Sequence, residues 1–173
     1  MVSLVIDDVA PFADWAAAAR RTLAVLHSTL GLDVWMVTHI EDDRQVVLFA
    51  HPQDLVPVRT TVPWDRSFCR KMLSGAGPRV STVTAATPAY AALLIDRPER
   101  VAAYLGVPLV TRTGTVFGTL CGVSARAQPR SFTRNLPLVE LLARMLSTLL
   151  PEDGATDDSL TSPLPGGPGR VGS

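Results

Sequence analysis

Apolar residues near the start of the chain recur at the spacing of a helix. Between Phe12 and Leu30 they lie three or four positions apart, which is the period of one helical face. Pro11 suits the first turn of such a helix, and Gly31 suits its end because glycine adopts the left-handed cap conformation easily. The pattern therefore predicts a first helix over 12–30.

Runs of β-branched and aromatic residues predict two pairs of strands. The first pair covers 33–41 and 45–50, and the polar residues between the two runs indicate a hairpin. The second pair covers 103–111 and 116–124, with Gly114 in the turn. Because the strands of this second pair are almost continuously apolar, we expect them to be covered on both faces.

The segment between the two hairpins has mixed character, because proline and glycine interrupt each regular run. We expect a short extended piece at 59–62, a helix at 65–73, a strand at 79–83 and helical turns around 89–95. A last helix is expected from about residue 135 or 136 to residue 150. Helices packed on an antiparallel sheet define the α+β class.

The last helix has a wide apolar surface. Seven of its residues form two adjacent stripes at helical spacing: Leu138, Leu142, Met145 and Leu149 in one, and Val139, Leu146 and Leu150 in the other. One sheet face should not need so much apolar surface. We therefore predict a homodimer through the first and last helices, with Leu146 and Leu150 at the interface.

Composition divides the chain into three parts. Residues 151–173 are rich in Pro, Gly, Ser and Asp and have almost no large apolar side chain, which predicts a disordered tail. Residues 1–11 are expected to form an N-terminal lead-in, and residues 12–150 a single domain.

Charge and special residues exclude several classes of function. The chain has 16 Lys and Arg and 16 Asp and Glu, so we expect no nucleic-acid partner. The absence of a signal-peptide pattern and of any run of roughly 18 apolar residues predicts a cytoplasmic protein without a membrane partner. The three histidines have no partner at metal-ligand spacing, and two cysteines are too few for a zinc site, so no metal is expected.

Several short strings follow one another in the order of a known family. They are Ser67-Phe68-Cys69, Tyr104-Leu105-Gly106-Val107-Pro108-Leu109, Gly114, Phe117-Gly118-Thr119-Leu120-Cys121 and Pro129-Arg130. In this order the strings resemble the GAF family, above all bacterial domains that read SFC, FYxGxPL, GxxxGTLC and PR. The resemblance implies a PAS-related α+β fold in which helices cover an antiparallel sheet and the N- and C-terminal helices pack together.

The resemblance also implies a function. It indicates a sensory or regulatory module that binds a small molecule or senses redox state and signals through a dimer or an unknown partner protein. Domains of this shape bind ligands between the sheet and a variable lobe. The side chains expected near that seam are the candidate ligand-binding residues: Trp35, Trp64, Phe68, Cys69, Tyr90, Tyr104, Phe117, Thr119 and Cys121. The sequence identifies no particular cofactor or ligand.

The two cysteines are open to two interpretations. Cys69 and Cys121 fall at matching positions of the family pattern, one near the start of a predicted helix and one within a predicted strand. They are either small buried hydrophobic residues or a reversible redox pair in which Cys69 is the attacking thiol. Under either interpretation we expect no structural disulfide in the resting protein.

We expect no catalytic activity, and two alternatives to a sensor stay open. One is an enzyme of the free methionine sulfoxide reductase kind, but such enzymes have cysteines in the variable lobe and none lies between Val83 and Arg100. The other is a ligand-free dimerisation scaffold. The sequence has no Gly-x-Ser-x-Gly elbow and no glycine-rich phosphate loop.

Overall fold

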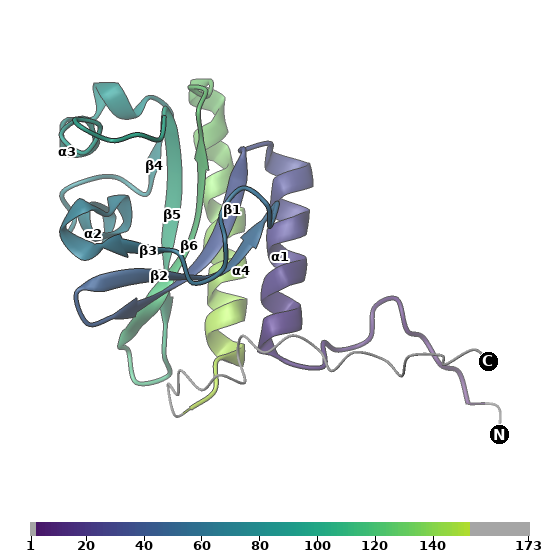
Figure 1. Cartoon of the computed structure of the whole chain (residues 1–173). Coiled ribbons are helices and arrows are strands. Elements are labelled where there is room, and N and C mark those ends of the chain that lie inside the picture. The colour runs from purple at the N-terminus through teal and green to yellow at the C-terminus, as the bar shows by residue number, and fades with distance from the viewer. Residues whose placement is uncertain (1–2, 153–173) are drawn as a thin grey trace, which may run out of the picture.

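An antiparallel sheet of six strands forms the centre of the computed structural model, which describes residues 3–152 (Figure 1). In spatial order the strands are β3 (Thr61–Pro63), β2 (Arg44–His51), β1 (Val34–Glu41), β6 (Val116–Ser124), β5 (Ala103–Val110) and β4 (Val80–Ser81). The two expected hairpins, β1 with β2 and β5 with β6, pair through β1 and β6 at the middle of the sheet. The predicted α+β class is therefore confirmed.

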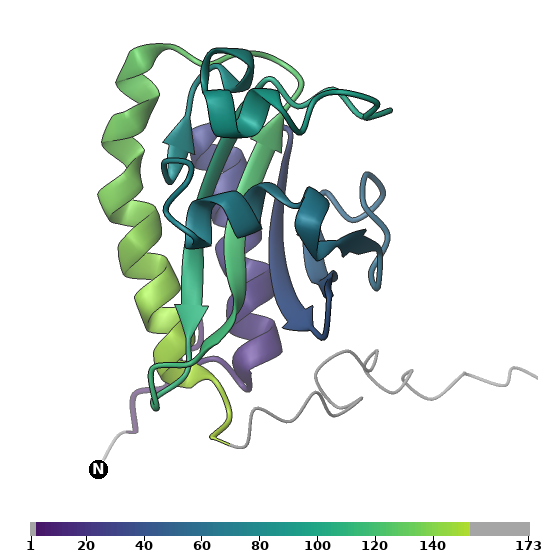
Figure 2. The same cartoon turned by 90° about the vertical axis from the view of Figure 1, so that its left-hand side faces the viewer.

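Different helices cover the two faces of the sheet (Figures 1 and 2). The long helices α1 (Trp15–Leu30) and α4 (Leu136–Leu149) cover one face, and η3 (Arg130–Asn135) leads into α4. The other face lies under a lobe, residues 64–100, whose helices are η1 (Trp64–Arg66), α2 (Phe68–Leu73), η2 (Thr84–Ala86) and α3 (Pro88–Ala91). As predicted, the two terminal helices pack together, and the indole Nε1 of Trp15 donates to the carbonyl oxygen of Leu146 at 3.0 Å.

Helix α1 begins later than predicted. The side chain of Asp14 accepts a hydrogen bond from the backbone N–H of Ala17 at 2.7 Å and so caps the first turn. Phe12 and Pro11 therefore lie before the helix, not in its first turn. The end of the helix agrees with the prediction, since Gly31 has a φ of 72°.

The lobe is less regular than the sequence predicted. The helix expected at 65–73 is divided, because Ser67 is extended and caps α2 by accepting a hydrogen bond from the backbone N–H of Cys69 at 3.0 Å. The strand expected at 79–83 has only the two residues of β4. Of the helical turns expected around 89–95, α3 contains only the first three residues.

The apolar surface of α4 divides differently from the predicted stripes. Leu146 is only 2% exposed and Leu150 only 7%, because both pack into the core between the helices and the sheet. The prediction that these two residues lie at a dimer interface is therefore wrong. The solvent-facing stripe of α4 consists of four other residues, each 43–56% exposed: Leu138, Leu141, Met145 and Leu149.

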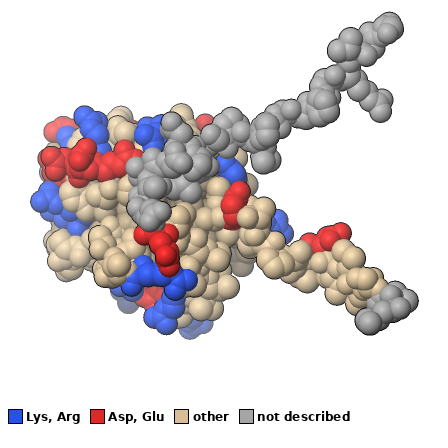
Figure 3. All heavy atoms as spheres, turned by 90° about the horizontal axis from the view of Figure 1, so that it is seen from below, with Lys and Arg blue, Asp and Glu red and all other residues tan. Residues whose placement is uncertain are grey.

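The face of the molecule seen from below carries side chains of both charges. In the view from below, basic and acidic side chains lie beside one another (Figure 3). Among the helices of residues 3–152, none has the length and apolar character that crossing a membrane requires. The expected tail lies outside the described residues except for residues 151 and 152.

Candidate functional site

Polar side chains are buried between the lobe and the middle of the sheet. Thr38 of β1, Gln45 of β2 and Thr119 of β6 are enclosed there together with Ser67 at the start of α2. Burial of an unpaired polar group costs roughly 1–3 kcal/mol, so such groups need partners. They find them in one another and in three more side chains. We call the whole set the polar centre: Thr38, Gln45, Ser67, Cys69, Tyr104, Thr119 and Cys121.

Gln45 connects most of the polar centre. Its Oε1 accepts a hydrogen bond from the hydroxyl of Ser67. Its Nε2 donates to Thr38 Oγ1 at 3.0 Å and to Cys69 Sγ at 3.1 Å. The hydroxyls of Thr38 and Thr119 are in turn 2.7 Å apart. One amide side chain therefore links the lobe to the strands beneath it.

The sulfur of Cys69 lies among hydrogen-bonding groups. Besides Gln45, the hydroxyl of Tyr104 donates to it at 3.3 Å, and Thr119 Oγ1 lies 3.2 Å away. The side chain of Cys121 is also hydrogen-bonded to Cys69, and this is the largest cause that lowers the pKa of the Cys69 thiol to about 6. Burial opposes that shift, while Thr119, Tyr104 and Gln45 reinforce it. The donors around Cys69 therefore favour its thiolate form.

The pKa of the second thiol, Cys121, is shifted in the opposite direction. Its hydrogen bond to Cys69 is the main cause that raises the pKa of Cys121 well above the ordinary value, and burial adds to the effect. Burial also raises the pKa of Tyr104, and the nearby charge of Cys69 reinforces this. Both shifts favour the protonated forms of Cys121 and Tyr104, and the Tyr104 hydroxyl donates to Cys69. The pair is chemically unequal, with one nucleophilic sulfur and one thiol beside it.

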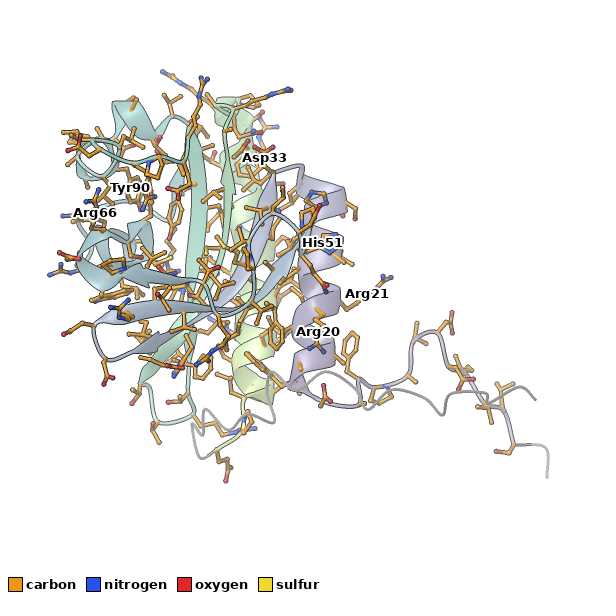
Figure 4. All side chains as sticks on the ribbon, in the orientation of Figure 1. Arg20, Arg21, Asp33, His51, Arg66 and Tyr90 are labelled. Carbon is orange, nitrogen blue, oxygen red and sulfur yellow. The ribbon has the colours of Figure 1, made fainter. Side chains whose placement is uncertain are left out.

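Aromatic rings enclose the polar centre from the lobe side. The ring of Phe68 lies 5.3 Å from that of Tyr90 and 5.5 Å from that of Tyr104, measured between centroids. The guanidinium of Arg97 lies 4.8 Å above the Phe68 ring, and burial lowers its pKa. Tyr90 lies within the lobe in Figure 4. The cover leaves Cys69 2% exposed.

A missing side chain on β5 makes room for Tyr104. A Cβ atom at Gly106 would lie 2.0 Å from the Tyr104 hydroxyl oxygen, so the ring occupies the space that glycine leaves open. A glycine inside a strand often marks a place where another group approaches the backbone closely. The structure identifies this group as the phenol that donates to Cys69.

The structure brings most of the predicted site residues together, but not all. Six of them lie in or directly over the polar centre: Phe68, Cys69, Tyr90, Tyr104, Thr119 and Cys121. Trp64 is half-buried and packs at the edge of this group. Trp35 and Phe117 instead lie on the opposite face of the sheet, in the core beneath α1 and α4.

Phe117 lies on that face because of a β-bulge. Leu109 pairs with Gly118 and Val110 pairs with Val116, so Phe117 is an extra residue in β6. Its ring packs against that of Trp15 at 5.7 Å between centroids. Regular alternation would have placed Phe117 on the same face as Thr119.

Sequence reasoning missed Thr38 and Gln45 and named Ser67 only as part of a motif. A signal was present for one of them, because Gln45 is the polar first residue of the run QVVLFA. Nothing local distinguishes Thr38, since threonine is common in strands.

The histidines lie away from the polar centre. His27 and His51 stack edge to face at 5.1 Å beside α1, where Figure 4 labels His51, and His39 Nδ1 is 2.7 Å from the carbonyl oxygen of Phe117. Within residues 3–152 no three side chains of His, Cys, Asp or Glu are grouped to hold a metal ion.

Comparison with known proteins gives one family and many similar folds. Residues 14–150 match the model of the GAF domain. No curated protein matches the sequence.

Three solved structures illustrate the similarity. Free methionine-R-sulfoxide reductase from Neisseria meningitidis, in complex with its substrate, is 22% identical, with a TM-score of 0.61 over 82% of this chain and 79% of that chain. The GAF domain of a phosphoenolpyruvate-protein phosphotransferase from Coxiella burnetii is 16% identical, with a TM-score of 0.62 over 82% and 84%. The second GAF domain of DevS from Mycobacterium smegmatis is 19% identical, with a TM-score of 0.55 over 78% and 94%. At these identities the similarity shows the fold alone.

Proposed function

Since the chain belongs to the GAF domain family, we propose that it is a sensory or regulatory module. Its input acts on the polar centre, either as a bound small molecule or as a change in the state of the thiols. The resulting change in packing is transmitted to α1 and α4 on the opposite face of the sheet, and these helices pass the signal on.

The proposal is supported mainly by one observation: the two central strands, β1 and β6, contact both the polar centre and the core beneath α1 and α4. In β1, Thr38 belongs to the polar centre while Trp35 and Val37 pack beneath the helices. In β6, Thr119 belongs to the polar centre while Leu120 packs beneath the helices. Adjacent side chains of a strand point to opposite faces, so a shift of either strand alters both packings together.

Protonation of Cys69 offers a built-in change of state with which to test the coupling. Hydrogen exchange of the α1 and α4 amides would be measured at pH 5 and pH 8, corrected for intrinsic rates, in the wild type and in Cys69→Ser. We expect a pH-dependent change in helix protection in the wild type that is absent in the variant. Comparison with the variant cancels the effects of pH on all groups that the two proteins share. Identical helix protection in all four samples would contradict the proposed route.

A homodimer is the proposed form of the output. The solvent-facing stripe of α4 (Leu138, Leu141, Met145 and Leu149) would lie between two copies. Sedimentation of the wild type should show a dimer, and Met145→Glu should shift it to a folded monomer. Glu152→Gln, which changes charge outside the stripe, serves as the control. A wild type that stays monomeric at high concentration would leave a separate partner protein as the recipient of the signal.

Reduction of free methionine sulfoxide is a second candidate, favoured by the thiolate of Cys69 beside the thiol of Cys121. In such a reaction two thiols become a disulfide while the sulfoxide becomes a thioether and water. The aromatic cover would have to open widely for an amino-acid substrate. Formation of free methionine in the presence of dithiothreitol, compared between the wild type and Cys69→Ser, tests this activity.

A further inference from the structure

We propose, as a refinement that rests on the sensory function above, that Cys69 and Cys121 form a hydroperoxide-reactive pair whose oxidant is hydrogen peroxide. The inference starts from the arrangement of side chains and not from either cysteine alone. Two thiols from separate elements, α2 and β6, lie in the same buried cluster of side chains. Neither is part of a disulfide.

The surrounding groups favour one particular sulfur as the nucleophile. Cys69 receives hydrogen bonds from Gln45 Nε2 and from the Tyr104 hydroxyl, and Thr119 Oγ1 lies 3.2 Å from its sulfur. A packing role alone would not require donors directed at a sulfur, because a free cysteine packs well as a small apolar residue. The donors hold negative charge on Cys69, which is the reactive form of a thiol.

The first step oxidises Cys69. Its thiolate sulfur attacks one oxygen of hydrogen peroxide, the S–O bond forms and the O–O bond breaks. The departing hydroxide takes up a proton from the solvent, which received one when the Cys69 thiol ionised, and leaves as water. Cys69 becomes a sulfenic acid, which is two electrons more oxidised than the thiol.

The second step uses Cys121. Once Cys69 is a neutral sulfenic acid, it no longer holds the charge that keeps Cys121 protonated. Cys121 loses its proton and its sulfur attacks the sulfur of Cys69, so that the S–S bond forms as the S–O bond breaks. The hydroxyl leaves with that proton as a second water. In sum, two thiols and one hydrogen peroxide give one disulfide and two waters, and a cellular dithiol reverses the change by exchange.

Burial selects for a small oxidant. Cys69 and Cys121 are 2% and 1% exposed, and Phe68 and Tyr90 cover them. Hydrogen peroxide is little larger than water and can pass during small movements of this cover. A bulky alkyl hydroperoxide such as cumene hydroperoxide would need the rings to separate.

The product would connect the two halves of the proposed sensor. A disulfide between Cys69 and Cys121 joins α2 of the lobe covalently to β6, the central strand that also packs beneath the helices through Leu120. The sulfur of Cys69 would at the same time lose its charge, so the hydrogen bonds from Gln45 and Tyr104 weaken. Oxidation therefore changes the contacts of Thr119, which belongs to the same network.

Peptide mass spectrometry of the full reduced chain tests the proposal. After graded hydrogen peroxide and blocking of the remaining thiols, we expect a linked Cys69–Cys121 peptide at oxidant concentrations near that of the protein. Cys121→Ser should instead accumulate a sulfenic acid on Cys69 that dimedone traps, and Cys69→Ser should give neither product. Cumene hydroperoxide should react at least tenfold more slowly than hydrogen peroxide with the wild type.

The pH profile and one conservative variant separate a reactive thiol from a buried one. The rate of Cys69 oxidation should rise with pH through the pKa of about 6. Tyr104→Phe keeps the ring and removes one donor. If the pKa of Cys69 then rises by about one unit, the rate at pH 6 falls about fivefold. Circular dichroism of each variant establishes that the fold is retained.

Three results would overturn the proposal. They are two unmodified thiols in the wild type after a large excess of peroxide, a linked peptide that forms equally well with cumene hydroperoxide, and primary oxidation at Cys121. The wild-type measurement decides the first two even if a variant fails to fold. The hydrogen-exchange test of the sensory function contains no oxidant, so a coupled but peroxide-inert protein and an uncoupled but peroxide-reactive one are distinguishable.

Discussion

The state of Cys69 should make the stability of the protein depend on pH. The hydrogen bonds from Cys121 and the other donors lower the pKa of this thiol from its ordinary value of 9.0 to about 6. The unfolded chain therefore binds a proton at pH values where the folded chain has already released it. Stability must then rise with pH between about 6 and 9, and be lost as pH falls through the folded value.

The size of the effect follows from the two pKa values. A shift of one unit corresponds to about 1.4 kcal/mol of differential interaction. Between pH 6.5 and pH 8 the free energy of unfolding should increase by about 2 kcal/mol from Cys69 alone. Above about pH 9 the trend should reverse, because the raised pKa values of Cys121 and Tyr104 favour ionisation in the unfolded chain.

Urea unfolding followed by tryptophan fluorescence measures the effect. The titration would be carried out at several pH values between 6 and 9 in the presence of a phosphine reductant, for the wild type and for Cys69→Ser. Below about pH 8 the difference between the two proteins reports Cys69, because Cys121 and Tyr104, whose pKa values depend partly on Cys69, affect stability only at higher pH. If the two proteins show parallel pH dependence to within about 0.5 kcal/mol, Cys69 is an ordinary neutral thiol and the assignment of the nucleophile is wrong.

Three further changes test the fold. Leu146→Ala should lower the free energy of unfolding by about 2–5 kcal/mol because it empties a core position, whereas Arg144→Ala, at an exposed position of the same helix outside the solvent-facing stripe, should change it by less than about 0.5 kcal/mol; equal losses in urea unfolding would mean that α4 is rotated. Gly118→Ala should give little folded protein, since its Cβ would lie 1.8 Å from the Thr38 carbonyl oxygen, and an unchanged melting temperature would contradict the pairing of β1 with β6. Asp14→Ala should cost about 1 kcal/mol in thermal unfolding, and no loss would show that α1 starts elsewhere.

Long, strongly patterned segments were predictable from the sequence. The strand expected at 116–124 is β6 to the residue, and the last helix agrees with α4 to within one or two residues. Such segments repeat their period several times, so local pattern and tertiary packing favour the same structure. In the lobe each element spans only a few residues. There a single hydrogen bond, such as the one that Ser67 accepts, decides where a helix starts.

The sequence predicted which residues form the candidate site better than it predicted how they are arranged. The family pattern brought out Cys69 and Cys121, but their contact depends on how α2 packs against β6, some fifty residues later in the chain. The strand pattern could not predict on which face of the sheet Phe117 lies, because one extra residue in β6 reverses the alternation of side chains. Gln45 was missed for a related reason, since its partners come from other elements.

The contact between Trp15 and Leu146 has a mechanical consequence. Residue 15 opens α1 and residue 146 lies near the end of α4, so the chain enters and leaves the domain at the same end of the molecule (Figure 1). A force that separates the two chain ends would act first on this contact and then separate α1 from α4 one turn after another. The sheet would bear almost no shear during this step. Tension in segments attached at residues 14 and 150 would thus separate the helices while the strands next to the two thiols stay paired.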